Sequence, residues 1–242
     1  MNMAAIRDLI YKFGWDTRCR NVDVARVLKS MIGTDTTILD AGCGNHGLAA
    51  FMPTANITGV DILPASEVDP SLKYIHASIL DLPFDDGSFD IAVSVDVLEH
   101  LPVDLRESAV QQMVRVARKA IVITFPGGEY ARKIDDAFAD ELQHRNMPLP
   151  EWLEEHLRDS YPESHDIASA IEAESSRLGR TVRIKTLHSE HSSAAKALRW
   201  AAARSKYIYI AANVAAGVAL PIMPRATADN AYRSIVVAEF DR

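Results

Sequence analysis

The residues whose types and spacing most clearly suggest chemistry lie at positions 38–47, in the stretch ILDAGCGNHG. This stretch begins as a short apolar run, and Gly42 and Gly44 then allow the backbone to turn sharply and to bring bare main chain against a ligand. A second apolar run ends at Asp61, an acid that can bind both hydroxyls of a ribose. Because ligands of open α/β sheets bind at the carboxyl ends of the strands, these residues together predict a nucleoside site.

Two nucleoside ligands compete for this site. Gly42, Gly44 and Gly47 match the G-x-G-x-x-G pattern of dinucleotide-binding proteins. However, Asp40 lies two residues before the first glycine, and its carboxylate would repel a pyrophosphate. The same carboxylate suits a ligand that carries ammonium and sulfonium charges. We therefore expect S-adenosylmethionine in preference to NAD, and an NAD-dependent oxidoreductase is the less favoured alternative.

The strands and helices that hold these residues in place can be predicted from short apolar runs that alternate with helical patterns. Helical periodicity is expected over the first 32 residues and over 46–52 and 103–118. Strand-like runs are predicted at residues 36–40, 57–61, 73–77, 89–95, 120–125, 181–187 and 231–240. Strands that alternate with helices predict a doubly wound α/β fold with a mainly parallel, seven-stranded sheet.

Two segments interrupt this alternation. Residues 128–178 are polar and mostly helical in pattern, and their three prolines indicate several short helices. Residues 190–229 form a connection far longer than a β-hairpin requires. We expect one domain over residues 1–242, in which 128–178 is a helical cap and 190–229 is a second insert, both covering the strand ends.

The motifs together resemble the class I S-adenosylmethionine-dependent methyltransferases, in the branch that acts on small molecules. Residues 38–47 resemble the family's first motif, GVDI at 59–62 its ribose motif, and LDLPFDDGSFDIAVSVDVLEHLP at 80–102 its most specific run. The resemblance covers roughly residues 34–126 and the last strand. It implies a Rossmann-like methyltransferase fold and an enzyme that methylates a small-molecule acceptor or a lipid- or glycan-linked one.

The resemblance also implies which residues contact the cofactor. Asp61 would bind the ribose, Ile62 would pack on the adenine, and Asp96 and Val97 would lie beside the methionine portion. Ser78 stands where the family usually has an aspartate, so its hydrogen bond to the adenine amine would lack charge assistance. The expected cofactor-binding residues are Asp40, Gly42, Gly44, Asn45, Asp61, Ile62, Ser78, Ile79, Asp96 and Val97.

His100 is the candidate catalytic residue. It follows the fourth strand directly after Glu99, so it would lie near the transferred methyl group and could accept a proton from the acceptor. The alternative is a residue that only lines the pocket, because methyl transfer can proceed through alignment and desolvation alone. A contact between the acceptor and a histidine of residues 128–178 is a further possibility. With only two cysteines no paired-cysteine zinc site can form, and we expect no metal ligands.

The charge composition argues against nucleic acid as a partner. The chain has 26 Lys and Arg against 33 Asp and Glu, a formal net charge of −7, so it lacks the basic surface of a dedicated nucleic-acid binder. Charged residues close to the start, without an apolar core of signal-peptide length, predict a cytoplasmic protein.

A further apolar stretch leaves several interpretations open. No charged residue lies between Lys206 and Arg225. This stretch could be a lid over the acceptor pocket, a contact between subunits, or, through residues 196–225, a peripheral contact with a membrane surface. A non-catalytic S-adenosylmethionine-binding protein or membrane-associated scaffold is the alternative to an enzyme.

Overall fold

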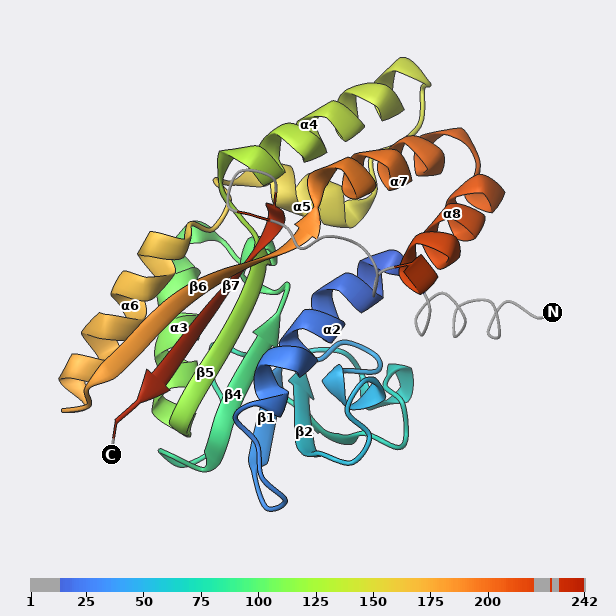
Figure 1. Cartoon of the computed structure of the whole chain (residues 1–242). Coiled ribbons are helices and arrows are strands. Elements are labelled where there is room, and N and C mark those ends of the chain that lie inside the picture. The colour runs from blue at the N-terminus through green and yellow to red at the C-terminus, as the bar shows by residue number, and fades with distance from the viewer. Residues whose placement is uncertain (1–13, 220–226, 228–230, 242) are drawn as a thin grey trace.

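A seven-stranded sheet forms the centre of the protein in a computed structural model, which describes residues 14–219, 227 and 231–241 (Figure 1). The strands are β1 (Thr37–Ala41), β2 (Asn56–Asp61), β3 (Lys73–His76), β4 (Phe89–Val95), β5 (Ala117–Pro126), β6 (Val182–His191) and β7 (Ala231–Phe240). Their order is β3-β2-β1-β4-β5-β7-β6. Strands β1 to β5 pair in parallel, whereas β7 runs antiparallel to both β5 and β6. The predicted doubly wound, mainly parallel seven-stranded fold is confirmed.

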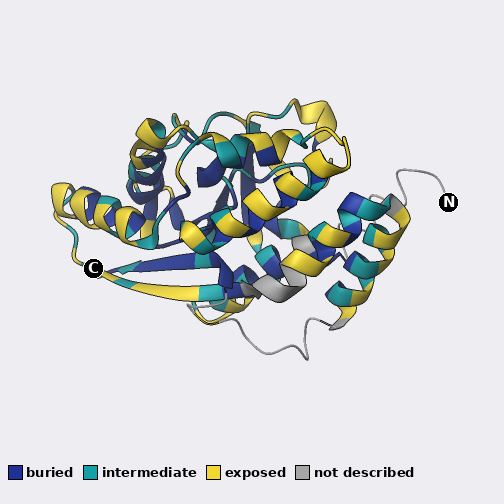
Figure 2. Ribbon diagram, turned by 90° about the horizontal axis from the view of Figure 1, so that it is seen from above, coloured by how far each residue is buried: buried dark blue, intermediate teal, exposed yellow. Residues whose placement is uncertain are grey.

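Helices cover both faces of the sheet. They are α2 (Trp15–Lys29), α3 (Val103–Val116), α4 (Gly128–His144), α5 (Glu151–Arg158), α6 (Ser164–Arg177), α7 (Ser192–Arg204) and α8 (Lys206–Ala219). On β4, Ile91 and Val93 pack in one core cluster with α2, while Ala92 packs in the other with α3. A strand buried on both sides reads as a continuous apolar run, which is why β4 was predicted with its observed bounds. Figure 2 shows the buried strands between helices with exposed outer faces.

The segment after the first strand differs from the prediction. In place of a helix over 46–52, the chain forms only a single 3-10 turn at Leu48–Ala50. Asp40 accepts a hydrogen bond from the Leu48 N–H at 2.6 Å, which fixes the start of this turn. Pro53 then disfavours helical backbone at the residue before it, so the helix cannot extend.

Only part of residues 128–178 lies over the strand ends, because α6, the last helix of this segment, packs against a face of the sheet. On α6, Ile167 and Ile171 lie in the same core cluster as Met113 of α3. Figure 1 shows α6 alongside α3, whereas α4, α5, α7 and α8 gather beyond the carboxyl ends of β4 and β5. Residues 220–226 and 228–230 of the second insert, and the helical pattern expected before residue 14, lie outside the described residues.

Candidate active site

The turn after β1 requires glycine at its first position. Gly42 has a φ of +82°, and a Cβ atom there would lie 2.3 Å from Cγ2 of Val97. The Gly42 N–H donates to the carbonyl of Val60 at 2.7 Å, so the turn packs tightly between β2 and the end of β4. Gly44 also has positive φ, at +60°, but a Cβ atom there would meet nothing within 4 Å. The first glycine is therefore needed for packing, and the second leaves bare main chain facing open space.

Asp40 is a buried acid at the end of β1, with 1% of its surface exposed. Burial, which disfavours the charged form, raises the pKa of Asp40 to about 6, although the hydrogen bond from Leu48 partly opposes this and Asp61 adds to it. A cationic ligand in the adjoining cavity would stabilise the ionised carboxylate.

Asp61 is oriented by the chain on both sides of it. Its Oδ2 accepts the Gly44 N–H at 2.8 Å, and its Oδ1 accepts the Leu63 N–H at 3.1 Å. Each carboxylate oxygen has a further lone pair that can accept a ribose hydroxyl. The next residue, Ile62, has 69% of its surface exposed, which is unusual for a large apolar side chain beside a cavity and suits a planar base.

One cavity of about 530 Å³ gathers the residues expected to contact the cofactor. Ser78 lies there with its hydroxyl already accepting the Leu80 N–H at 3.1 Å. His100 lines the same cavity. The ten expected residues that line it are Asp40, Gly42, Gly44, Asn45, Asp61, Ile62, Ser78, Ile79, Asp96 and Val97.

Asp96 lies at the end of β4 with a φ of +54°. Its Oδ2 accepts a hydrogen bond from Nε of the buried Arg233 at 2.7 Å, and Arg20 of α2 lies 3.5 Å away. The hydroxyl of Thr124 donates to Oδ1 at 3.1 Å. Two cations thus offset the negative charge of this buried carboxylate. Arg233 was not predicted from the sequence, where the signal for it is a basic residue inside a largely apolar strand.

A second cavity, of about 470 Å³, adjoins the first and shares Arg20, Asp96 and His100 with it. Helices α4, α5, α7 and α8 supply much of its wall. Its aromatic lining comes from Trp15, Phe138, Trp152, Tyr209 and Tyr232. Sequence analysis did not identify this set, because the five residues are far apart in the chain and each has the pattern of an ordinary core residue.

His100 lies where the two cavities meet, in the 3-10 turn Leu98–His100 that follows β4. Its Nδ1 is 2.5 Å from Oε2 of Glu155 on α5. Burial and the neighbouring His156 lower the pKa of His100, and the contact with Glu155 opposes this. With Nδ1 bonded to a carboxylate, Nε2 is the ring atom that can interact with a ligand.

Comparisons with known proteins agree with this geometry. Residues 39–123 match the family described as "Methyltransferase domain". Over 108 residues the chain is 32% identical to 27-O-demethylrifamycin SV methyltransferase of Amycolatopsis mediterranei. This match covers 39% of this chain and 36% of that protein. Over 158 residues it is 29% identical to 2-methyl-6-phytyl-1,4-hydroquinone methyltransferase of Synechocystis, covering 60% of this chain and 46% of that protein.

The chain therefore contains a segment, residues 39–123, that matches a methyltransferase domain. It spans less than two thirds of the length of these relatives. A solved S-adenosylmethionine-dependent methyltransferase of Thermotoga maritima superposes with a TM-score of 0.54 at 13% identity, covering 99% of this chain and 96% of that one, and thus shares the fold.

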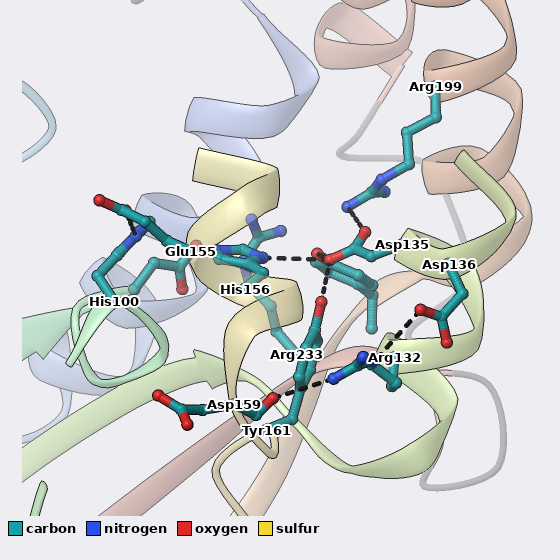
Figure 3. A network of polar contacts seen from close by, with 12 residues as sticks. His100, Arg132, Asp135, Asp136, Glu155, His156, Asp159, Tyr161, Arg199 and Arg233 are labelled. Carbon is teal, nitrogen blue, oxygen red and sulfur yellow. Dashed lines mark hydrogen bonds and ion pairs between the residues drawn. The ribbon is translucent and has the colours of Figure 1, made fainter. Parts of the chain in front are cut away.

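A buried polar network supports the cap formed by α4, α5 and α7 (Figure 3). Asp135 of α4 is completely buried and pairs with Arg199 at 2.9 Å. It accepts hydrogen bonds from the hydroxyls of Tyr161 and Tyr232, at 2.6 and 2.7 Å, and lies 3.1 Å from Nδ1 of His156. Burial alone would raise the pKa of Asp135, but these partners outweigh it and lower the pKa. His156 itself is buried, with 6% of its surface exposed.

Glu99 is the least satisfied charged group among the described residues that line the two cavities. Only 3% of its surface is exposed, and neither carboxylate oxygen has a hydrogen-bond partner among the described residues. Burial and the nearby Asp96 raise the pKa of Glu99 well above its ordinary value. His144 and His165, by contrast, are exposed and do not line either cavity.

Proposed function

We propose that this protein transfers the methyl group of S-adenosylmethionine to a small-molecule acceptor bound in the second cavity. The observation that carries the proposal is the meeting of the two cavities at Asp96 and His100. One cavity gathers the residues expected around a nucleoside, and the other has aromatic walls of a size that suits a small organic molecule. Two similar proteins, a rifamycin methyltransferase and a hydroquinone methyltransferase, act on small molecules by their names and support an acceptor of this kind.

The proposed cofactor contacts follow from the geometry of the first cavity. Asp61, held by two main-chain N–H groups, binds the ribose hydroxyls, and the exposed Ile62 packs against the adenine. Open space beside Gly44 admits the ligand to the main chain. Asp40 and Asp96 place carboxylates near the positively charged methionine portion.

The bound cofactor supplies an electrophilic methyl group. The protein aligns the acceptor atom with that group and excludes water through the walls of the second cavity. We propose that Nε2 of His100 accepts the proton released by an acceptor hydroxyl or amine. The Glu155 carboxylate, 2.5 Å from Nδ1, would stabilise the imidazolium that forms.

The test combines binding with turnover. Calorimetry should show one S-adenosylmethionine site, and incubation with methyl-labelled cofactor and fractionated small-molecule extracts should give a labelled product together with S-adenosylhomocysteine. Saturable binding without turnover on any fraction would favour the non-catalytic alternative. NADH binding without a response to S-adenosylmethionine would contradict the proposal.

A lipid-linked acceptor is the second candidate, because α7 and α8 expose large apolar side chains. Trp200, Tyr207, Ile208 and Val218 are each about half exposed or more, and Lys196 next to them is exposed and basic. Among the described residues, no helix is long and apolar enough to cross a bilayer. A peripheral contact at the cytoplasmic face of a membrane would use these side chains. Flotation with vesicles of anionic lipid tests this, and protein left entirely in the dense fraction would contradict it.

A further inference from the structure

Three side chains that can bind metals meet in the second cavity. Glu99 and His100 belong to the turn after β4, and His156 lies on α5. Each offers a ligand atom, and these three atoms all lie within 4.8 Å of one another. All three residues line the second cavity. Two imidazoles and one carboxylate thus lie close together, although they come from two separate elements.

The two histidines are held in the manner of metal ligands. Nδ1 of His100 contacts Glu155, and Nδ1 of His156 contacts Asp135 at 3.1 Å (Figure 3). Asp135 is fixed in turn by the hydroxyls of Tyr161 and Tyr232. A carboxylate on one ring nitrogen fixes the orientation of the imidazole and makes the other nitrogen a better ligand. Nε2 is therefore the remaining ligand atom on each ring.

The state of Glu99 is a second observation, independent of the histidines, that indicates a bound cation. Its side chain is buried and lines the cavity, and its two oxygens have no hydrogen-bond partner among the residues that the structure describes. A buried carboxylate in that condition is costly unless a cation or a donor joins it. A metal ion held between Glu99 and the two Nε2 atoms would satisfy the carboxylate.

We infer that Glu99, His100 and His156 form a binding site for a divalent transition-metal ion, with zinc as the best match. Two histidines and one carboxylate are a donor set of zinc sites, whereas magnesium and calcium prefer oxygen ligands alone. Three protein ligands leave a coordination position open to the cavity. The inference departs from the expectation of no metal, which rested on the lack of paired cysteines.

This inference shares His100 with the proposed function. A bound ion uses the same Nε2 lone pair that would accept the acceptor's proton, so the two uses exclude each other. Zinc should therefore inhibit methyl transfer. Binding of the ion itself does not depend on cofactor or acceptor.

The experiment is a titration of the untagged full chain with cobalt(II), without cofactor or acceptor. We expect one equivalent to give the intense visible absorption of a four- or five-coordinate ion, and zinc to abolish it by competition. Glu99→Gln and His156→Gln should each weaken binding strongly, and Glu155→Gln should weaken it by about 10–100-fold, because that residue only orients a ligand. His165→Gln, at an exposed histidine, is the matched control and should bind as the wild type does.

Two results would overturn the site. One is a spectrum that stays that of hydrated cobalt, and the other is unchanged affinity in Glu99→Gln and Glu155→Gln. These two variants decide the question even if His156→Gln does not fold, and circular dichroism checks their folding. Metal binding without methyl transfer would leave the site standing and count against the proposed function. Zinc that accelerates methyl transfer would support the site and contradict proton acceptance by His100.

Discussion

At the scale of the residue, the site depends on acids whose burial opposes their ionisation. Asp40 and Glu99 both have a raised pKa because little water reaches them. Asp96 and Asp135 are buried as well, but each has cationic and hydroxyl partners. Among the described residues, Glu99 has no hydrogen-bond partner and Asp40 accepts only the Leu48 N–H, so a cationic ligand in the adjoining cavity can add an interaction to each. The partners of Asp96 and Asp135 come from several elements and tie those elements together.

Asp40→Asn should stabilise the protein more at high pH than at low pH. The pKa of Asp40 in the folded protein is about 6, above the ordinary 3.8, so the folded state favours the protonated form. Its contribution to stability is complete below the ordinary pKa and is lost as the pH rises through about 6, a loss of about 3 kcal/mol for a shift of about two units. Asparagine has no such loss and can still accept the Leu48 N–H.

Urea unfolding at pH 5 and pH 8 measures this difference. The stabilisation by Asp40→Asn should be larger at pH 8, while the affinity for S-adenosylmethionine should fall. Asp35→Asn, at an exposed acid, is the control and should show neither effect. Equal stabilisation at both pH values would show that ionisation of Asp40 is not the cause.

His100→Ala should lower kcat by about 10²–10⁴-fold, the usual contribution of a general base. The folded structure should persist, because the side chain is half-buried and sits at the border of a cavity. Steady-state kinetics with a hydroxyl acceptor measures the loss, and added imidazole should restore part of the turnover. Full turnover in this variant would leave His100 as a residue that only lines the pocket.

At the scale of the element, the two glycines of the turn between β1 and the 3-10 helix Leu48–Ala50 differ in their surroundings: Gly42 packs against Val97, and Gly44 faces open space. Gly42→Ala should reduce the free energy of unfolding by about 1–3 kcal/mol, because it adds both positive-φ strain and a clash with Val97. Gly179→Ala is the control, since Gly179 has a φ of +68° but open space around its Cβ position, and it should cost less.

The double variant Gly42→Ala with Val97→Ala separates the two causes. Removing the Val97 methyl groups should recover most of the difference between Gly42→Ala and Gly179→Ala in a thermal or urea melt. A double variant that is merely additive would show that Val97 does not restrict this turn.

The sequence specified the cofactor cavity far better than the acceptor cavity, for a physical reason. Asp40, Gly44 and Asp61 follow consecutive parallel strands, and the fold brings such strand ends to one edge, so local motifs were sufficient. Trp15 and Tyr232 meet only because α2, the cap and β7 pack together. Their side chains look like core residues in sequence, and their common cavity depends on packing over long range. The ligand set of Glu99 and His156 was missed for the same reason.

At the scale of the whole molecule, two adjoining cavities should allow the two ligands to be perturbed separately. Ile62→Ala should weaken S-adenosylmethionine binding, because a large exposed apolar surface at the cofactor cavity is lost. Trp152→Ala should raise the KM for the acceptor, because Trp152 lines only the second cavity. Calorimetry for the cofactor and kinetics for the acceptor measure the two effects. If Trp152→Ala changed cofactor affinity as much as Ile62→Ala, the assignment of the cavities would be wrong.

Strand β7 has a consequence that reaches across the molecule. Tyr232 bonds to Asp135 in the cap, and its neighbour Arg233 bonds to Asp96 beside the cofactor cavity. Adjacent residues of one strand therefore connect the cap to Asp96, which both cavities share, and we predict that a ligand that shifts one of them also shifts the other. Thermodynamic reciprocity then requires that, if S-adenosylhomocysteine tightens acceptor binding by some factor, the acceptor tightens S-adenosylhomocysteine by the same factor. We expect this cooperativity to vanish in Arg233→Met.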